Sequence, residues 1–142
     1  MKLTFQLLKE EHALAIVTWC YTPPYDCYNL AVHTVKENLY YLLDSENAFY
    51  AILNSQGELE GYCSFGLDGQ VPGGDYRVAA LDTGIGIRPD LTGQRRGEQY
   101  AQAVMKYGAE RYGAQKLRVS IAEFNIRAQH VWEKLEFERR QC

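Results

Sequence analysis

The residues best suited to chemistry lie in a short loop with two glycines. This loop comprises Thr92, Gly93, Gln94, Arg95, Arg96 and Gly97. An apolar run ends before it, at Pro89, and an amphipathic helical pattern begins after it, at Glu98. A strand, a glycine loop and a helix N-terminus together offer free backbone N–H groups, and the helix dipole favours negative charge there. The spacing therefore predicts a binding site for a phosphorylated ligand.

Two familiar phosphate loops do not match these residues. In a mononucleotide P-loop a lysine and a hydroxyl residue follow the last glycine, whereas Gly97 is followed by Glu98 and Gln99. In a dinucleotide-binding fold the glycine motif follows the first strand, whereas this loop lies late in the chain. Neither kind of nucleotide site is therefore expected here.

A second motif, further along the chain, narrows the range of phosphorylated ligands that the loop could bind. Asn125-Ile126-Arg127-Ala128 is followed by Trp132-Glu133-Lys134-Leu135-Glu136-Phe137, and the first motif begins with Ile85-Gly86-Ile87-Arg88-Pro89. In this order and at this separation the two motifs resemble those of the GNAT superfamily of acyl-CoA-dependent N-acyltransferases. That family carries L-x-V-x-P, then Q/R-x-x-G-x-G/A, then N-x-x-A-x-x-x-Y-E-K-x-G-F. The resemblance covers residues 77–137.

The resemblance implies transfer of an acetyl group from acetyl-CoA to a primary amine of a small molecule, peptide or protein, with no metal. The pyrophosphate would lie on the loop from Thr92 to Gly97, where glycines let the backbone approach. The peptide-like pantetheine arm would pair with backbone groups of Ile85 and Ile87, which requires the sheet to splay open beside that strand. Asn125 would hold the pantetheine end, or would cap the last helix, or both.

Departures from the family pattern leave the catalytic chemistry open. Thr92 replaces a glutamine or arginine, and Arg95 replaces the middle glycine, where a positive φ would strain it. Trp132 replaces a tyrosine that often donates the proton, and an indole N–H cannot do so near neutrality. Ser120 stands where one branch has a glutamate. A water chain, the leaving thiolate itself or a tyrosine from elsewhere in the chain must then move the proton. Two function classes remain: an N-acetyltransferase, and a non-catalytic acyl-CoA-binding module that has lost its acid–base residues.

The segment between the first two expected helices, which borders the acceptor pocket in the family, supplies candidate acid–base residues. Tyr25 and Tyr28 are candidate catalytic residues, and with Asp26, which could attract a cationic amine, they would bind the acceptor. The alternative is that the tyrosines only cover the core. Asp82, on the strand before the loop, is a further candidate base, with a hydrogen bond in the sheet as its alternative. His12 is expected on a helix surface.

The elements that must position these residues follow the order β-α-α-β-β-β-α-β-α. Apolar patterning predicts strands at residues 3–7, 48–53, 59–65, 78–87 and 117–121. Helical spacing predicts helices at residues 10–19, 29–43, 98–112 and 125–135. This order predicts a single α/β domain over residues 1–142 with a mixed sheet. The resemblance implies a GNAT-like, mostly antiparallel sheet, splayed at the cofactor cleft and flanked by about four helices.

The C-terminus departs from that architecture. Only five residues follow Phe137, so the C-terminal strand that closes the family's sheet is expected to be short or missing. An open sheet edge tends to recruit another strand, which favours a homodimer as the simplest closed arrangement. The alternative is a monomer, in which the charged residues Glu138, Arg139 and Arg140 keep that edge soluble.

Composition bounds the possible partners and compartment. The chain is 46% hydrophobic and 23% charged, as is typical of a soluble globular domain. A net charge of −3 gives no basic footprint for nucleic acid, and no apolar run approaches the ~20 residues of a membrane span. The four cysteines lack C-x-x-C spacing, which argues against a zinc site and favours the reducing cytoplasm.

Overall fold

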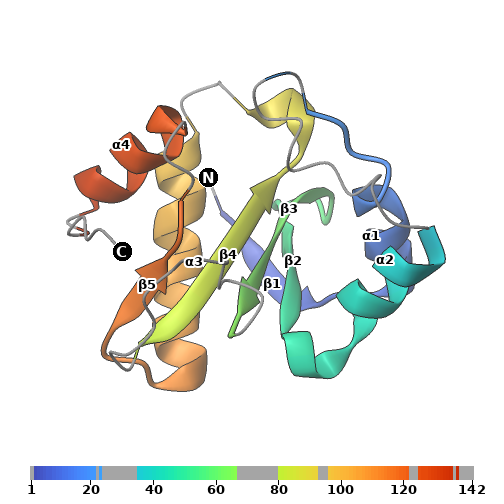
Figure 1. Cartoon of the computed structure of the whole chain (residues 1–142), viewed down its shortest axis with the longest axis horizontal. Helices are drawn as coiled ribbons and strands as arrows, with labels where there is room; N and C mark the ends of the chain where they lie inside the picture. The colour runs from blue at the N-terminus through green and yellow to red at the C-terminus, as the bar shows by residue number, and fades with distance from the viewer. Residues whose placement is uncertain are drawn as a thin grey trace.

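The computed structural model describes residues 2–21, 23, 35–66, 80–92, 96–121, 125–135 and 137. One sheet contains strands β1 (Thr4–Leu7), β2 (Phe49–Leu53), β3 (Leu59–Phe65), β4 (Leu81–Ile87) and β5 (Leu117–Val119), in that spatial order (Figure 1). The helices are α1 (Glu10–Ile16), α2 (Val35–Leu43), α3 (Gly97–Tyr112) and α4 (Ile126–Lys134). Two short 3-10 helices, η3 (Ser45–Asn47) and η5 (Pro89–Leu91), complete the described elements.

The sheet is mixed and opens at one side. Strands β1 to β4 are antiparallel neighbours, whereas β4 and β5 run parallel. The ladder between β4 and β5 covers only Leu81 to Thr83, and beyond it the two strands diverge (Figure 1). The predicted order of elements and the predicted α/β fold with a mixed, open sheet are therefore confirmed.

Each face of the sheet carries its own hydrophobic core. On one face α3 packs through residues such as Val104 against Ile52 of β2. On the other face Ile16 of α1 and Leu42 of α2 pack with Phe49. Phe49 and Ile52 are an odd number of residues apart on one strand, so their side chains point to opposite faces. The alternation in β2 thus places helices on both sides of the sheet.

Several boundaries differ from the predicted ones. The first helix ends at Ile16 rather than residue 19, because the N–H groups of Thr18 and Trp19 bond three residues back and tighten the chain into a 3-10 turn. Strand β5 ends at Val119, where its pairing with β4 stops. Of the helix predicted at residues 29–43, the described part begins at Val35. Residues 138–142 lie outside the described residues, so the expectation about a closing strand stays a prediction.

The expectation that His12 is exposed is wrong. His12 is 8% exposed and occupies the first turn of α1, where its Nδ1 accepts a hydrogen bond from the backbone N–H of Lys9 at 3.1 Å. Burial lowers the pKa of this imidazole, although the nearby carboxylate of Glu11 opposes that effect. The residue therefore caps a helix instead of facing solvent.

No helix in the described part of the chain is long and apolar enough to cross a membrane.

Candidate functional site

A cavity of about 370 Å³ lies where β4 and β5 diverge. Its walls come from the C-terminal part of β4, from residues 119–121 at the end of β5, from the first turns of α3 and from α4. Tyr21 and Tyr62 add aromatic surface from the segment after α1 and from β3. The two motifs singled out in the sequence thus face each other across one opening.

The backbone of β4 presents hydrogen-bonding groups to this cavity. The carbonyl of Asp82 accepts the N–H of Gly66 at 2.8 Å, and the N–H of Arg88 donates to the carbonyl of Glu60 at 2.9 Å, so both residues direct their backbone groups toward the β3 side. Successive residues of a strand direct their backbone groups to alternate edges, so Ile85 and Ile87 direct theirs to the opposite edge. At that edge the described ladder to β5 has already ended at Thr83. The carbonyl of Ile87 already accepts one hydrogen bond, from the Tyr21 hydroxyl at 2.7 Å. An extended, peptide-like ligand could therefore pair with the N–H groups of Ile85 and Ile87, with the carbonyl of Ile85 and with the second lone pair of the Ile87 carbonyl.

The start of α3 borders the same cavity. The first hydrogen bond within this helix runs from the N–H of Gln99 to the carbonyl of Arg96, at 3.1 Å. The N–H groups of Gly97 and Glu98 come before it and therefore have no partner within the helix. The side chain of Arg96, which occupies the N-cap position, makes no capping hydrogen bond to this start. A Cβ on Gly97 would lie 3.1 Å from the Cγ2 of Val131 in α4. The missing side chain of Gly97 therefore serves close packing of α3 against α4, which the sequence did not indicate.

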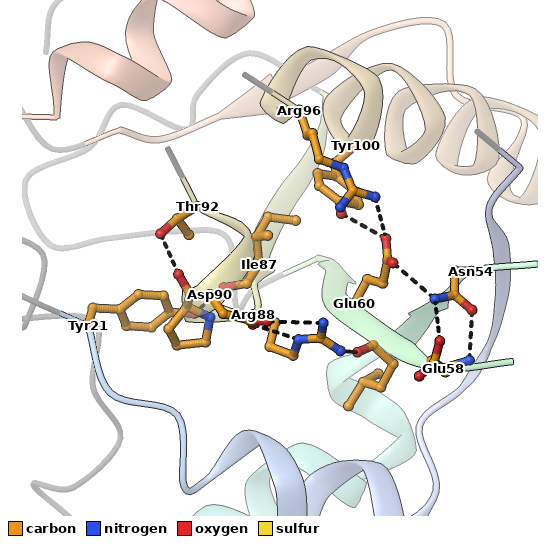
Figure 2. Close-up of polar contacts among 12 residues, drawn as sticks. Tyr21, Asn54, Glu58, Glu60, Ile87, Arg88, Asp90, Thr92, Arg96 and Tyr100 are labelled. Atoms are coloured by element: carbon orange, nitrogen blue, oxygen red, sulfur yellow. Dashed lines mark hydrogen bonds and ion pairs between the residues drawn. The ribbon is translucent and has the colours of Figure 1, made fainter. Parts of the chain in front are cut away.

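The turn before the loop is held by local bonds. Arg88 donates to both carboxylate oxygens of Asp90, at 2.7 Å and 3.2 Å (Figure 2). Thr92 lines the cavity, and its hydroxyl donates to the carbonyl of Pro89 at 2.7 Å, which closes η5. That hydroxyl keeps lone pairs but has already used its proton. Thr92 therefore does not replace the long donor that the family has at this position.

Arg96 does not extend toward solvent from the loop. Its guanidinium donates to Glu60 Oε1 at 2.9 Å and lies over the ring of Tyr100 at 5.2 Å (Figure 2). The Tyr100 hydroxyl donates to the same oxygen at 2.8 Å. This contact between β3 and α3 was not foreseen. A charged residue inside the otherwise apolar run Leu59–Phe65 was the available signal.

The second motif forms the wall opposite β4. Asn125 caps α4, because its Oδ1 accepts the N–H of Ala128 at 3.1 Å, and it also lines the cavity. Trp132 is 5% exposed, lines the cavity and meets the ring of Phe137 edge-on at 4.8 Å. The indole thus occupies a cavity wall where the family has a tyrosine. Ser120 also lines the cavity.

Asp82 lies at the base of the opening in an ion pair. Its carboxylate accepts two hydrogen bonds from Arg118, at 2.6 Å and 3.0 Å, and its side chain is 6% exposed. The two residues are also register partners in β4 and β5. This bidentate pair joins the two strands just before they diverge, which fits the structural alternative for Asp82 better than a role as base.

Two tyrosines approach β4 near the open edge. The hydroxyl of Tyr21 donates to the carbonyl of Ile87 at 2.7 Å, and burial raises the pKa of this phenol, with a smaller effect from Tyr62. The ring of Tyr62 covers Gly86, where an added Cβ would lie 2.5 Å from the ring. Gly86 is therefore needed for close packing of this ring, a role that the motif alone did not reveal.

Several predicted site residues cannot be placed. Gly93, Gln94 and Arg95 of the loop, and Tyr25, Asp26 and Tyr28 of the segment after α1, lie outside the described residues. The described residues contain no cluster of three or more histidine, cysteine or acidic side chains that could hold a metal ion.

Comparison with known proteins defines the class of this chain. The model of the acetyltransferase (GNAT) family matches residues 11–137, and the chain therefore belongs to this family. Comparison with curated proteins gives no match.

Several solved structures share the fold of this chain. An aminoglycoside acetyltransferase AAC(6')-Ib in complex with coenzyme A is similar, with a TM-score of 0.73, 17% identity and coverage of 98% of this chain and 86% of the other. A GNAT-family acetyltransferase from Bacillus anthracis has a TM-score of 0.71 and 14% identity, and the match covers 98% of this chain and 81% of the other. A dodecameric spermidine N-acetyltransferase from Vibrio cholerae has a TM-score of 0.66 and 18% identity, with coverage of 97% of this chain and 80% of the other. At these identities the likeness concerns the fold.

Proposed function

We propose that the protein is an N-acetyltransferase that transfers the acetyl group of acetyl-CoA to a primary amine. The observation that carries this proposal is the open edge of β4, where the backbone of Ile85 and Ile87 faces a cavity that begins at the N-terminus of α3. A coenzyme A molecule has a pyrophosphate and a peptide-like arm that match these two features in the same order. Similar structures named for spermidine and aminoglycoside acetylation support an amine as acceptor.

The cosubstrate would lie along β4. Its pyrophosphate would accept hydrogen bonds from the start of α3, at Gly97, and from the loop before it, which contains Thr92, Gly93, Gln94, Arg95 and Arg96. Its pantetheine amides would pair with Ile85 and Ile87. Asn125 would add a side-chain amide near the thioester while its oxygen keeps capping α4.

The chemistry requires an uncharged amine. Its nitrogen attacks the thioester carbonyl, the C–S bond breaks, and the proton lost by nitrogen must reach the departing sulfur. We assign this proton transfer to Tyr25 or Tyr28, and attraction of the cationic form of the acceptor to Asp26. Asp82 is the weaker candidate base because Arg118 holds its carboxylate.

A second candidate function is an acyl-CoA-binding module without turnover. The observation in its favour is the buried indole of Trp132 at the cavity wall, where the family has an acid–base tyrosine. Both candidates require acyl-CoA binding, and only the acetyltransferase requires an acceptor.

Two measurements test these candidates. Calorimetry with acetyl-CoA should show binding, and release of free thiol should follow when spermidine, an aminoglycoside or a lysine peptide is added. Binding without thiol release across a broad amine panel would favour the binding module. Absence of acetyl-CoA binding would contradict both.

Oligomeric state and location are also proposals. We infer a homodimer in the cytoplasm, with no nucleic-acid or membrane partner; the described cysteines, Cys20 and Cys63, are free thiols, which suits a reducing compartment. Light scattering over a dilution series should show a dimer mass. A monomer mass at every concentration would contradict the dimer.

A further inference from the structure

Glu60 is an unusual residue for its place in the sheet. In the pairing of β2 with β3, Ile52 faces Gly61 and Leu53 faces Leu59, so Glu60 is the extra residue of a β-bulge. Leu59 and Tyr62 both pack with the α1 and α2 core. The bulge lets Glu60 point to the opposite face, toward α3. Bulges commonly re-aim a side chain in this way next to functional sites.

The carboxylate of Glu60 is buried and fully engaged. Its side chain is 8% exposed. Oε1 accepts from the Arg96 guanidinium and from the Tyr100 hydroxyl, and Oε2 accepts from the Asn54 amide at 3.0 Å (Figure 2). Burial would raise the pKa of this carboxyl, but hydrogen bonds from Asn54 and Tyr100 and the charge of Arg96 outweigh it and lower the pKa. The group is therefore a carboxylate near neutrality.

The same stretch of β3 also holds the start of the phosphate loop. The carbonyl of Glu60 accepts the N–H of Arg88 at 2.9 Å, and the carbonyl of Leu59 accepts a guanidinium N–H of Arg88 at 2.9 Å. Arg88 lies four residues before the loop, and Arg96 is the next-to-last residue of the loop. The chain is thus tied to two consecutive residues of β3 on both sides of the loop's central residues.

We propose that Glu60 is a positioning residue for the pyrophosphate end of the acyl-CoA site, because its carboxylate clamps the first turn of α3 to β3. This inference rests on the proposed function. Through Arg96 and Tyr100, Glu60 fixes the direction of the N–H groups at the start of α3, and it keeps the Arg96 guanidinium on β3. The pyrophosphate then meets pre-oriented backbone donors and pays little ordering entropy.

Glutamine cannot take over this role. Asn54 Oδ1 already accepts the N–H groups of Gln56 and Glu58, at 2.9 Å each, so its NH₂ group must face residue 60. The NH₂ group of a glutamine would therefore meet another donor, either at Asn54 or at Arg96 and Tyr100. Glu60→Gln preserves the size of the side chain and disrupts the clamp.

The experiment compares two ligands that differ at the pyrophosphate end. Binding of acetyl-CoA and of S-acetylpantetheine, which lacks the phosphates, is measured on the wild-type protein, on Glu60→Gln and on Glu58→Gln. Glu58 is exposed, lies one residue before β3 and accepts from the same Asn54 amide at 3.2 Å. The carbonyl oxygen of a glutamine at this position still accepts that bond and its NH₂ group faces solvent, so Glu58→Gln is a control of identical chemistry. Glu60→Gln should weaken acetyl-CoA binding about tenfold and change acetylpantetheine binding less than about twofold. Glu58→Gln should leave both unchanged.

The other outcomes are decisive as well. Unchanged or tighter acetyl-CoA binding by Glu60→Gln would overturn the inference, and so would equal losses for both ligands, which would indicate general distortion of the cleft. Tyr100→Phe removes one donor to Glu60 while keeping the ring, and it serves if Glu60→Gln does not fold. It should weaken acetyl-CoA about threefold and spare acetylpantetheine, and equal binding of acetyl-CoA by this variant and by the wild type would refute the clamp. Failure of the wild-type protein to bind acetyl-CoA would refute the proposed function instead.

Discussion

The two edges of β4 differ in how their hydrogen bonds are satisfied. Toward β3 the strand has five register pairs, from Thr83 to Ile87, and side chains pack tightly across the join. Toward β5 it has three pairs, which end at Thr83. One strand therefore serves the stability of the sheet with one edge and offers a ligand the other. The difference teaches that in this domain the paired edge holds the strand in place while the other edge stays open to a ligand.

Substitutions of the tyrosines that we assign to proton transfer should have the largest effect on turnover. Tyr25→Phe or Tyr28→Phe should slow acetyl transfer about 100-fold or more, because a positioned proton donor typically contributes that much. Trp132→Phe should change turnover far less, because an indole packs against the cavity without giving up a proton. Steady-state rates with a reactive amine check this. Loss of turnover in Trp132→Phe alone would reverse the assignment.

The Asp82–Arg118 pair, which joins β4 to β5 just before the two strands diverge, should be the most sensitive point for stability. Asp82→Asn removes the negative charge that accepts two hydrogen bonds from Arg118, and Arg118→Met removes those two donors from Asp82. We expect each change to lower the free energy of unfolding by about 2–3 kcal/mol, less than for a fully buried pair because Arg118 is 21% exposed. Urea denaturation measures this. If Asp82 were a catalytic base, Asp82→Asn would abolish turnover while Arg118→Met, at matched stability, would not.

The closed edge should tolerate no added atom at Gly86. Gly86→Ala places a Cβ 2.5 Å from the ring of Tyr62, and we expect a loss of about 1–3 kcal/mol in unfolding free energy. The same change in a Tyr62→Ala background should cost much less, because the clashing ring is gone. Equal costs in the two backgrounds would show that the ring does not restrict this position.

A smaller effect is expected from acidification. The pKa of Glu60 is lower in the folded protein than its ordinary value of 4.5, so its contribution to stability is present above that value and is lost as pH falls through the folded pKa. Unfolding free energy measured between about pH 6 and pH 3 should fall less steeply in Glu60→Gln than in the wild type. Parallel curves for the two proteins would contradict this.

The sequence predicted the elements and the loop, and it predicted less well what depends on contacts between distant residues. The ends of β3 were predicted correctly at Leu59 and Phe65, because the hairpin turn at residues 54–57 that precedes the strand is a local signal. Asp82 pairs with Arg118 across 36 residues, and no local pattern indicates that contact. Glu60 faces α3 only because an extra residue enters the ladder to β2, and a bulge leaves no periodic trace in so short a strand.

In the candidate site, too, the sequence predicted local features better than contacts between distant residues. Asn125 was open to a role as cap or as ligand-binding residue, and its oxygen does cap α4 while the residue lines the cavity. His12 was placed on the surface because helical spacing does not reveal which polar residue turns inward to cap its own helix. Gly97 fitted a phosphate loop by motif, and the structure adds that its missing side chain makes room for Val131 of α4.

Amide hydrogen exchange along β4 tests the central claim most directly. Gly86 and Arg88 direct their N–H groups toward β3, so their exchange should already be slow and should change little with ligand. If the pantetheine arm pairs with the open edge, saturating acetyl-CoA should slow exchange at Ile85 and Ile87 by about tenfold or more, beyond any change at the β3-facing amides. If acetyl-CoA binds and slows exchange at Ile85 and Ile87 no more than at Gly86 and Arg88, the account is contradicted.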